Sequence, residues 1–164
     1  MYNCPDPMVT IVLNTAMKTI FDKTTQIELI ARIATLNKNS TALWGQMTIY
    51  QMLKHCTQWE EMISGKIICK RVFIGRLFGK LALKSSIKDE SPMMRNAVTS
   101  PELTVKETMG DIEPEKLKWI ALIEENFNFS NPGFVHPFFG KMTKEQVGYL
   151  AYKHTDHHLR QFGR

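Results

Sequence analysis

The sequence is poor in cysteine and contains no long apolar run. Its three cysteines, Cys4, Cys56 and Cys69, are odd in number and form no C-x-x-C pair. This excludes a disulfide framework and favours reduced thiols in the cytoplasm. No stretch approaches the roughly 18 uncharged apolar residues of a membrane-spanning helix, and residues 1–6 have no basic start typical of a secretory signal. We therefore expect a cytoplasmic protein without a membrane span.

Internal repeats, low-complexity tracts and long flexible linkers are absent as well, so nothing divides the chain. A folded chain of 164 residues buries roughly 70% of the surface that its unfolded form exposes, which is enough for one hydrophobic core. We predict a single domain over residues 1–164. Residues 1–20 form an N-terminal arm in this prediction, and its short apolar stretch, residues 8–13, packs on the rest.

Capping signals predict most of the helices. A Thr followed three residues later by Glu or Gln forms a capping box, and three such boxes begin at Thr25, Thr48 and Thr143. They predict helices that end near residues 36, 64 and 162. Pro114 suits the first turn of a further helix that ends near residue 126. No apolar alternation predicts a pair of strands. The expected fold class is all-α, a four-helix bundle with an accessory helix in residues 66–88.

Positive charge is concentrated in this accessory segment. Residues 66–88 hold seven Lys or Arg and no acidic residue, interleaved with apolar side chains. Such a helix can lie on an anionic membrane or a nucleic-acid backbone. We favour a bundle helix with a solvated lysine face, because that arrangement gives the same pattern. Nucleic-acid binding is not expected, and it would show itself by an affinity that falls steeply with salt.

The histidines suggest a metal site. His154 and His158 are one turn apart on the last predicted helix, and a helical wheel places both on its apolar stripe with Val147 and Leu150. Two imidazoles on such a stripe can hold a metal ion together, or they can be hydrogen-bonded core residues. His55, at the flank of the apolar face of the second helix, offers a third ligand. Three histidines with open coordination positions are typical of catalytic zinc and related ions.

Other polar residues are placed around this cluster by the same wheel. His157 lies at the edge of the stripe and His136 in a loop, and these two are the obvious candidates for a general base. Gln161 faces the core one turn beyond His158, where its amide could orient a ligand or the substrate. Asp156 points away from the cluster and is interpreted as a solvated surface carboxylate.

The remaining thiols and indoles are interpreted as structural. Cys56 falls on the core stripe of its helix, so we expect a buried thiol rather than a ligand or a nucleophile. Trp44, Trp59 and Trp119 are expected to serve packing.

Two blocks of sequence that contain these histidines resemble a known family. Residues 44–56 read WGQMTIYQMLKHC, and residues 136–163 begin HPFFGKMT and end YKHTDHHLRQFG. Both are similar to the DinB-like (DinB/YfiT-type) superfamily of metal-binding four-helix bundles, in a bacterial branch with no assigned reaction. The resemblance covers the chain from about residue 21 onward. It implies a divalent metal ion held by His55, His154 and His158.

The resemblance also implies an activity. Characterised members of the superfamily are transferases and isomerases that use bacillithiol, mycothiol or glutathione. It therefore suggests a metal-dependent enzyme that activates a low-molecular-weight thiol for attack on an electrophilic substrate. Nickel, zinc and manganese are all possible, and the nitrogen ligands favour zinc or nickel over magnesium or calcium. Hydrolysis by metal-activated water and a non-catalytic metal-binding or stress-response bundle are the alternatives. Since relatives often pair, a homodimer is expected.

Overall fold

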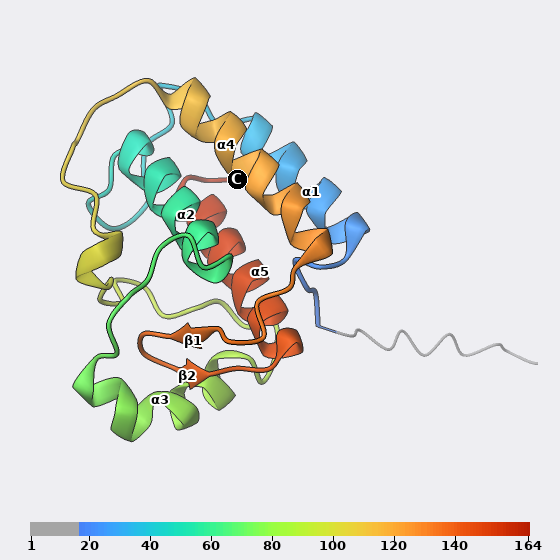
Figure 1. Cartoon of the computed structure of the whole chain (residues 1–164). Helices are drawn as coiled ribbons and strands as arrows, with labels where there is room; N and C mark the ends of the chain where they lie inside the picture. Colours follow the sequence, from blue (N-terminus) through green and yellow to red (C-terminus); the bar gives the residue numbers. More distant parts are fainter. Residues whose placement is uncertain (1–16) are drawn as a thin grey trace, which may run out of the picture.

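Four helices pack in a ring around one core, and each contacts two neighbours in the order α1, α4, α2, α5. They are α1 (Lys23–Ala34), α2 (Ile49–Ile63), α4 (Ile112–Glu125) and α5 (Lys144–Gln161). The protein was analysed as a computed structural model that describes residues 17–164 (Figure 1). Two short 3-10 helices, η1 (Pro101–Leu103) and η2 (Asn126–Asn128), lie in the connections. The predicted all-α bundle is confirmed.

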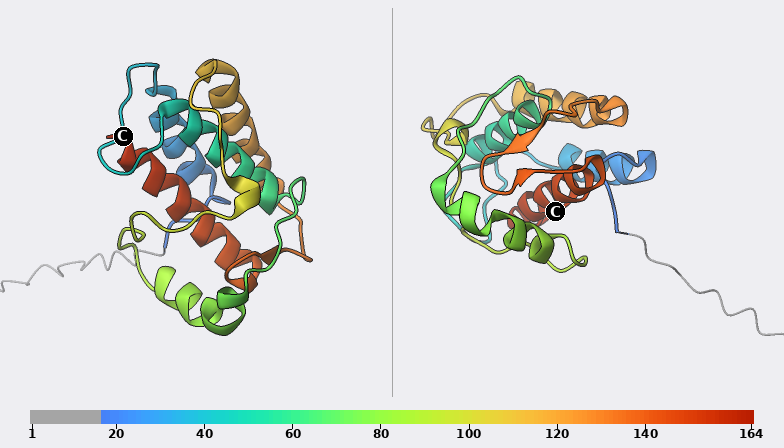
Figure 2. Two further views of the ribbon diagram at one scale, coloured as in Figure 1. Left: turned by 90° about the vertical axis from the view of Figure 1, so that its left-hand side faces the viewer. Right: turned by 60° about the horizontal axis from the view of Figure 1, so that its bottom comes forward.

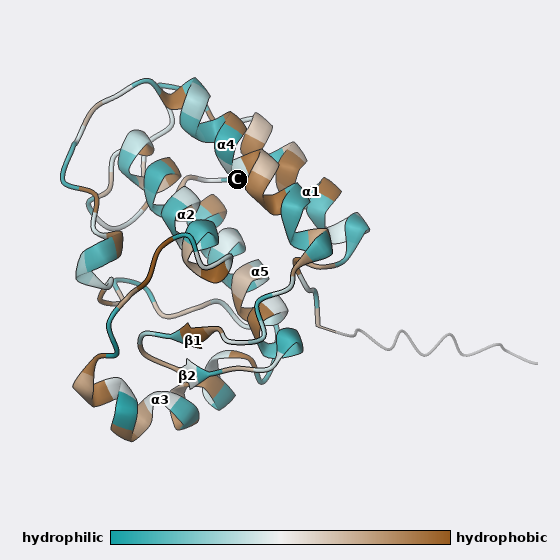
Figure 3. Ribbon diagram, in the orientation of Figure 1, coloured by the Kyte–Doolittle hydropathy of each residue, from teal (hydrophilic) through white to brown (hydrophobic). Residues whose placement is uncertain are grey.

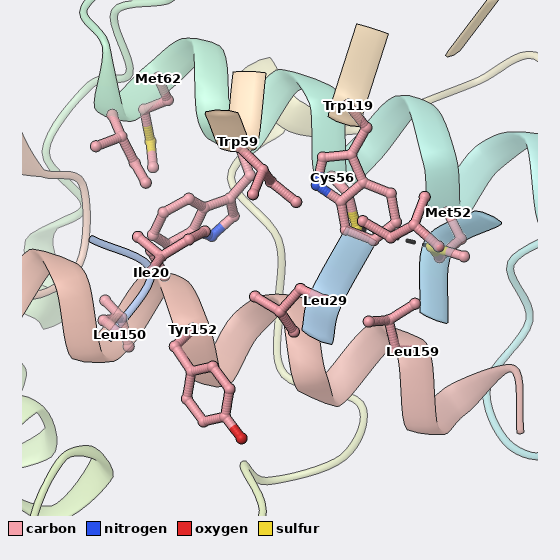
Figure 4. Close-up of a cluster of buried hydrophobic side chains, with 14 of the residues drawn as sticks. Ile20, Leu29, Met52, Cys56, Trp59, Met62, Trp119, Leu150, Tyr152 and Leu159 are labelled. Carbon is pink, nitrogen blue, oxygen red and sulfur yellow. Dashed lines mark hydrogen bonds between the residues drawn. The ribbon is translucent and has the colours of Figure 1, made fainter. Parts of the chain in front are cut away.

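The core lies between the four bundle helices. Leu29 of α1, Trp119 of α4 and Leu159 of α5 are fully buried and converge on α2 (Figure 4). Each large apolar side chain buried in this way stabilises the fold by about 1.5–3 kcal/mol. Cys56 is buried among them with its sulfur 3.7 Å from that of Met52, as expected for a structural thiol. Burial raises the pKa of this thiol well above its ordinary value.

Two of the predicted capping boxes are present. The Thr48 hydroxyl accepts a hydrogen bond from the Gln51 backbone N–H, and the Gln51 side chain accepts one from the Thr48 N–H. Thr143 and Gln146 make the same pair of bonds at the start of α5. Each pair satisfies backbone donors that the helix itself leaves free. These two helices carry the candidate site. The caps fix the first residue of each helix and therefore the positions of the site residues along it.

The other two predicted helix starts are wrong by a few residues. Asp22 caps α1, and its carboxylate accepts from the Thr25 backbone N–H at 2.8 Å. Thr25 is therefore buried inside the first turn and is not a cap. Asp111 caps α4, which begins at Ile112, ahead of Pro114. At α1 the upstream Asp22 supplies the acceptor that the sequence pattern assigned to Thr25, and at α4 Asp111 supplies a cap where the sequence analysis had named none.

A short hairpin precedes α5, although no strand pair was expected. Strand β1 (Val135–His136) pairs antiparallel with β2 (Gly140–Lys141), with His136 opposite Gly140. Each strand has only two residues, too few for any alternation of apolar and polar side chains to be visible in the sequence. The hairpin brings His136 toward the bundle.

Helix α3 (Phe73–Ser86) lies outside the bundle and contacts β2 (Figures 1 and 2). Gly75 and Gly79 face the hairpin, where a Cβ atom at either position would collide with the carbonyl oxygen of Phe138. The accessory helix predicted in residues 66–88 is present, and Arg76, Lys80 and Lys84 are exposed, as expected of a solvated basic face. Its interpretation as a bundle helix is wrong. The helix is shorter, and most of its large apolar side chains face the solvent because the glycine side faces the protein.

The predicted N-terminal arm is only partly described. Ile20 is fully buried, and its backbone N–H donates to the Gly148 carbonyl at 3.2 Å, which joins the arm to α5. Residues 8–13, expected to pack on the bundle, lie outside the described residues. Among residues 17–164, no helix has the length and apolar character needed to cross a membrane.

We predict that Gly79→Ala destabilises the protein by about 1–3 kcal/mol, because the added methyl group meets backbone that cannot rotate away. The free energy of unfolding, measured in urea by circular dichroism, tests this. Lys84→Ala on the exposed side of the same helix is the control and should change the free energy by less than about 0.5 kcal/mol. Equal effects of the two substitutions would contradict the close packing of α3 on the hairpin.

Candidate metal centre

Three histidines from two helices meet in the interior of the bundle. His55 projects from α2, and His154 and His158 project from α5. One ring nitrogen of each lies within 4.8 Å of the others, and the Nε2 atoms of His55 and His154 are 3.2 Å apart. The side chains are 4–8% exposed, so they are buried but not sealed from solvent. The structure thus brings together all three residues that the sequence selected.

Hydrogen bonds to neighbouring oxygens fix the protonation of two of these rings. His55 Nδ1 lies 3.2 Å from the Leu103 carbonyl, which can only accept, so Nδ1 carries the proton. His158 Nδ1 lies 2.9 Å from Gln161 Oε1, and the Gln161 amide nitrogen donates to the Trp44 carbonyl at 2.9 Å. His158 Nδ1 is therefore also a donor. Both rings keep a free lone pair on Nε2, the arrangement found in histidines that ligate metals.

Burial keeps the three rings neutral. It lowers the pKa of His158 to about 3 and holds the pKa of His154 well below its ordinary value. The neighbouring imidazoles lower the pKa of His154 further, because their charged forms would repel a charge on it. Burial lowers the pKa of His55 too. Neutral imidazole is the form that binds a metal ion, so these rings would not have to lose a proton to bind one near neutral pH.

The donor set also fits a cation in its geometry. With zinc–nitrogen bonds of 2.0–2.1 Å, ligand nitrogens of a tetrahedral site are about 3.3 Å apart. The Nε2 atoms of His55 and His154 are 3.2 Å apart, which is close to this value. His154 poses a problem without an ion, since its buried Nδ1 has no hydrogen-bond partner among the described residues. A proton on Nε2 leaves Nδ1 a bare acceptor, and a proton on Nδ1 leaves two lone pairs facing each other across 3.2 Å. A cation between the Nε2 atoms removes the second conflict. The cluster could therefore hold a metal ion.

Trp59 forms one wall of the site, a role that the sequence analysis missed. Its ring stacks on His154 with the centroids 4.6 Å apart and the planes 28° apart. The side chain is buried, so the packing role expected for it is also correct. Trp59 follows His55 by four residues, which places both on neighbouring positions of α2, and this spacing was the available signal.

His136 lies near the cluster on the hairpin, but its hydrogen bonds restrict what it can do. Its Nδ1 accepts from the backbone N–H groups of Phe138 at 3.1 Å and Phe139 at 3.2 Å. The proton of the neutral ring is therefore on Nε2. Burial, with the Arg71 guanidinium, lowers its pKa to about 3. This geometry suits a neutral hydrogen-bond donor better than the general base considered from the sequence.

His157, Trp44 and Arg95 lie beside the histidine cluster, and we call these three residues the rim. His157 is half-buried. The centroid of its ring lies 5.2 Å from the centroid of the His158 ring and 5.8 Å from that of the Trp44 ring. The Arg95 guanidinium stands 4.1 Å above the Trp44 ring. Burial lowers the pKa of His157, and Arg95 contributes to the shift. The rim therefore presents one fixed positive charge beside two aromatic rings.

Asp156 points away from the histidines as expected, but its interpretation as a solvated surface carboxylate is wrong. It is 9% exposed and pairs with Arg32 of α1 at 2.9 Å and with Arg160 of α5 at 2.6 Å. Its pairing with Arg32 joins α5 to α1. The wheel of α5 gives the direction of Asp156, but it does not show that α1 covers that side.

We predict that His136 contributes to the acid sensitivity of the metal-free protein. Its pKa rises from about 3 when folded to about 6.5 when unfolded, so the unfolded state binds more protons between these values. The free energy of unfolding should therefore fall as the pH falls through this range, by up to about 1.4 kcal/mol per unit from this residue.

The matched variant is His136→Asn, whose side-chain oxygen can accept the same backbone N–H groups but does not titrate. Urea unfolding with a chelator present, at about pH 7, 6 and 5, measures both slopes. Wild type should lose stability more steeply than the variant on acidification. Parallel curves would contradict a buried, neutral His136.

Comparison with known proteins gives one match. A family model described as "Protein of unknown function (DUF1569)" matches residues 8–164, which is nearly the whole chain. No curated protein and no solved structure matches the chain significantly.

Proposed function

Since the chain belongs to the DUF1569 family, a family of unknown function within the DinB-like superfamily, we propose its function from its own site: a divalent-metal-dependent enzyme that activates a small thiol. The observation that carries the proposal is the convergence of three buried, neutral imidazoles at His55, His154 and His158. Nitrogen ligands favour zinc or nickel over magnesium or calcium. That the chain belongs to a bacterial branch, lies in the cytoplasm and forms a homodimer stays a prediction from the sequence.

The number of ligands favours catalysis over a structural role. Structural zinc sites usually close with four protein ligands, whereas the described residues supply only three to this group. The bound ion would supply a Lewis acid that lowers the pKa of a thiol or water at an open position. Leu103 and Gln161 hold two of the ligand rings in the required orientation through their Nδ1 protons. Trp59 and the neighbouring apolar core limit the access of water.

Among residues 17–164 no cysteine is suited to serve as the attacking thiol, so the proposal takes a thiol from outside the chain. Cys56 is buried with a pKa well above its ordinary value, and burial raises the pKa of Cys69 as well. Neither is suited to form a thiolate. Arg95 at the rim favours a thiol that carries a carboxylate, and His157 beside it is placed to hydrogen-bond an incoming group. In this scheme the thiol gives its proton to water and its sulfur forms a bond to an electrophilic carbon, while the bond from that carbon to its leaving group, or to the epoxide oxygen, breaks. The leaving group departs as an anion, and an epoxide oxygen takes a proton from water. His157 or the His136 Nε2–H would donate a hydrogen bond to the second substrate.

We expect protein purified without a histidine tag to contain about one equivalent of a divalent metal ion, because the three ligands converge on one point. His55→Ala and His154→Ala should each lose it. His157→Ala is the matched control and should retain it, since this histidine lies outside the three-residue group. Plasma mass spectrometry measures the metal content.

A weaker effect is expected from Gln161→Leu, which removes the oxygen that orients His158. Loss of such a supporting bond typically reduces metal affinity by about 10–100-fold, and a competition titration with a chelator measures it. The absence of metal from wild type even after reconstitution would contradict the proposal, and so would retention by His154→Ala.

For the metal-loaded protein, we predict faster consumption of an electrophile in the presence of a carboxylate-bearing thiol. Glutathione and bacillithiol, each with a chloronitrobenzene or an epoxide, are the probes, and loss of the free thiol is followed over time. Arg95→Ala should raise the KM for the thiol up to about fivefold with little change in kcat, because Arg95 is exposed and binds the thiol without touching the reacting sulfur.

Lys38→Ala removes an exposed charge elsewhere and is the control for Arg95→Ala. A metal-loaded protein that accelerates no thiol reaction, but hydrolyses an ester or amide, would favour water as the nucleophile. A loaded protein with neither activity would favour the second candidate, a non-catalytic metal-binding or stress-response bundle.

A further inference from the structure

Helix α3 exposes a large apolar face that no described part of the chain covers. Five apolar side chains on this helix are 55–75% exposed: Phe73, Ile74, Leu77, Phe78 and Leu81. At 100° per residue they fall within an arc of about 140°, so they form one continuous surface, which we call the α3 apolar face. The hydropathy colouring shows apolar residues along this outlying helix (Figure 3). Contiguous apolar surface of this kind usually marks an interaction site.

The orientation of this face is fixed by packing on the opposite side of the helix. Gly75 and Gly79 lie against the backbone of Phe138, where no larger side chain fits. The Arg71 guanidinium donates to the Phe138 carbonyl at 3.3 Å and to the Gly75 carbonyl at 3.3 Å. The helix therefore cannot rotate to bury its large apolar side chains without losing these contacts. Within residues 17–164, their exposure follows from the fold.

Basic side chains line one edge of the α3 apolar face. Arg76, Lys80 and Lys84 are exposed and follow one another at four-residue spacing, which places them in a row along the helix. Lys80 donates to the Lys141 carbonyl, and Lys141 adds a further exposed positive charge. No acidic residue occurs in residues 66–88, and none of the described ion pairs involves the row.

We propose that α3 docks the protein on the surface of an anionic lipid bilayer, with the α3 apolar face among the acyl chains and the basic row at the headgroups. Amphipathic helices bind in the plane of the membrane in this way when apolar side chains and Lys or Arg lie side by side. The long stems of Lys and Arg let their charges reach the headgroups while the apolar face is immersed. This docking is independent of the metal centre.

Two other occupants explain the face less well. A nucleic-acid backbone pairs with the basic row, but it leaves Leu77, Leu81 and their apolar neighbours without a partner. A second copy of the chain would bury the apolar side chains in a symmetric contact, but it would also bring a second basic row to that contact, with no carboxylate on either helix to pair with the two rows. Anionic lipid satisfies both halves of the surface.

The test is co-sedimentation of the full chain with vesicles of phosphatidylcholine containing about 30 mol% phosphatidylglycerol, beside vesicles of phosphatidylcholine alone. The protein should bind the anionic vesicles at least tenfold more strongly. Leu77→Gln should reduce this binding about tenfold or more, because it removes a large apolar side chain from the immersed face. Leu117→Gln on α4 is the matched control, since Leu117 is 63% exposed and Leu77 is 62% exposed.

Charge is tested separately. Arg76→Gln and Lys84→Gln should each weaken binding about fivefold, whereas Lys38→Gln, at an exposed site away from α3, should not. Circular dichroism of each variant confirms that it is folded. Equal binding of Leu77→Gln and wild type would overturn the proposal, and so would equal binding to the two kinds of vesicle.

Two further measurements separate the competing occupants. Binding to duplex DNA or single-stranded RNA that is unaffected by Leu77→Gln, without binding to vesicles, would overturn the proposal in favour of nucleic acid. Sedimentation velocity would overturn it in favour of self-association if wild type is a dimer that Leu77→Gln converts to a monomer and neither form binds vesicles.

Discussion

Three imidazoles can be buried at one point only if all of them are neutral, and this requirement shapes much of the structure. A charge on any ring would lie beside the other two in a dry interior. The pKa of each ring is accordingly lowered. Protons on His55 and His158 are directed outward, to the carbonyl of Leu103 and the amide oxygen of Gln161. The lone pairs that remain point inward, where a cation would accept them.

The groups that orient the neutral histidine rings come from segments far apart in the chain. Leu103 belongs to η1 in the long connection between α3 and α4, and Trp44 belongs to the turn before α2. The Trp44 carbonyl receives the Gln161 amide, and the next residue, Gly45, has a φ of 79° with Gln161 so close that a side chain would meet its amide nitrogen. The Trp-Gly pair before α2 thus has a structural reason, because only glycine combines this backbone conformation with such a close approach.

The three histidines of the candidate site could be predicted from the sequence, and most of the groups that hold them in place could not. His154 and His158 share a helical face with the buried residues of α5, and that is a local property of periodicity. Gln161 was placed correctly by the same wheel. The Leu103 carbonyl and the Arg32 partner of Asp156 depend on which segments meet in space, and no local pattern contains that information. A helical wheel gives the direction in which a side chain projects from its helix. Whether that side chain is buried depends on which segment lies in that direction.

In helix α3 the sequence analysis failed in the opposite way, because apolar side chains that it expected to be buried are exposed. Its mixture of apolar and basic residues predicts an amphipathic helix, but it does not tell which face the protein covers. The glycines decide this, because Gly75 and Gly79 allow the helix backbone to approach the hairpin more closely than any apolar face could. The same hairpin carries His136. The centroid of its ring lies 4.6 Å from that of Phe139 and 6.0 Å from that of Trp59. Trp59 in turn stacks on His154. One hairpin therefore separates the exposed apolar face of α3 from the histidine cluster, and a surface that meets the first lies only a few packed side chains from the second.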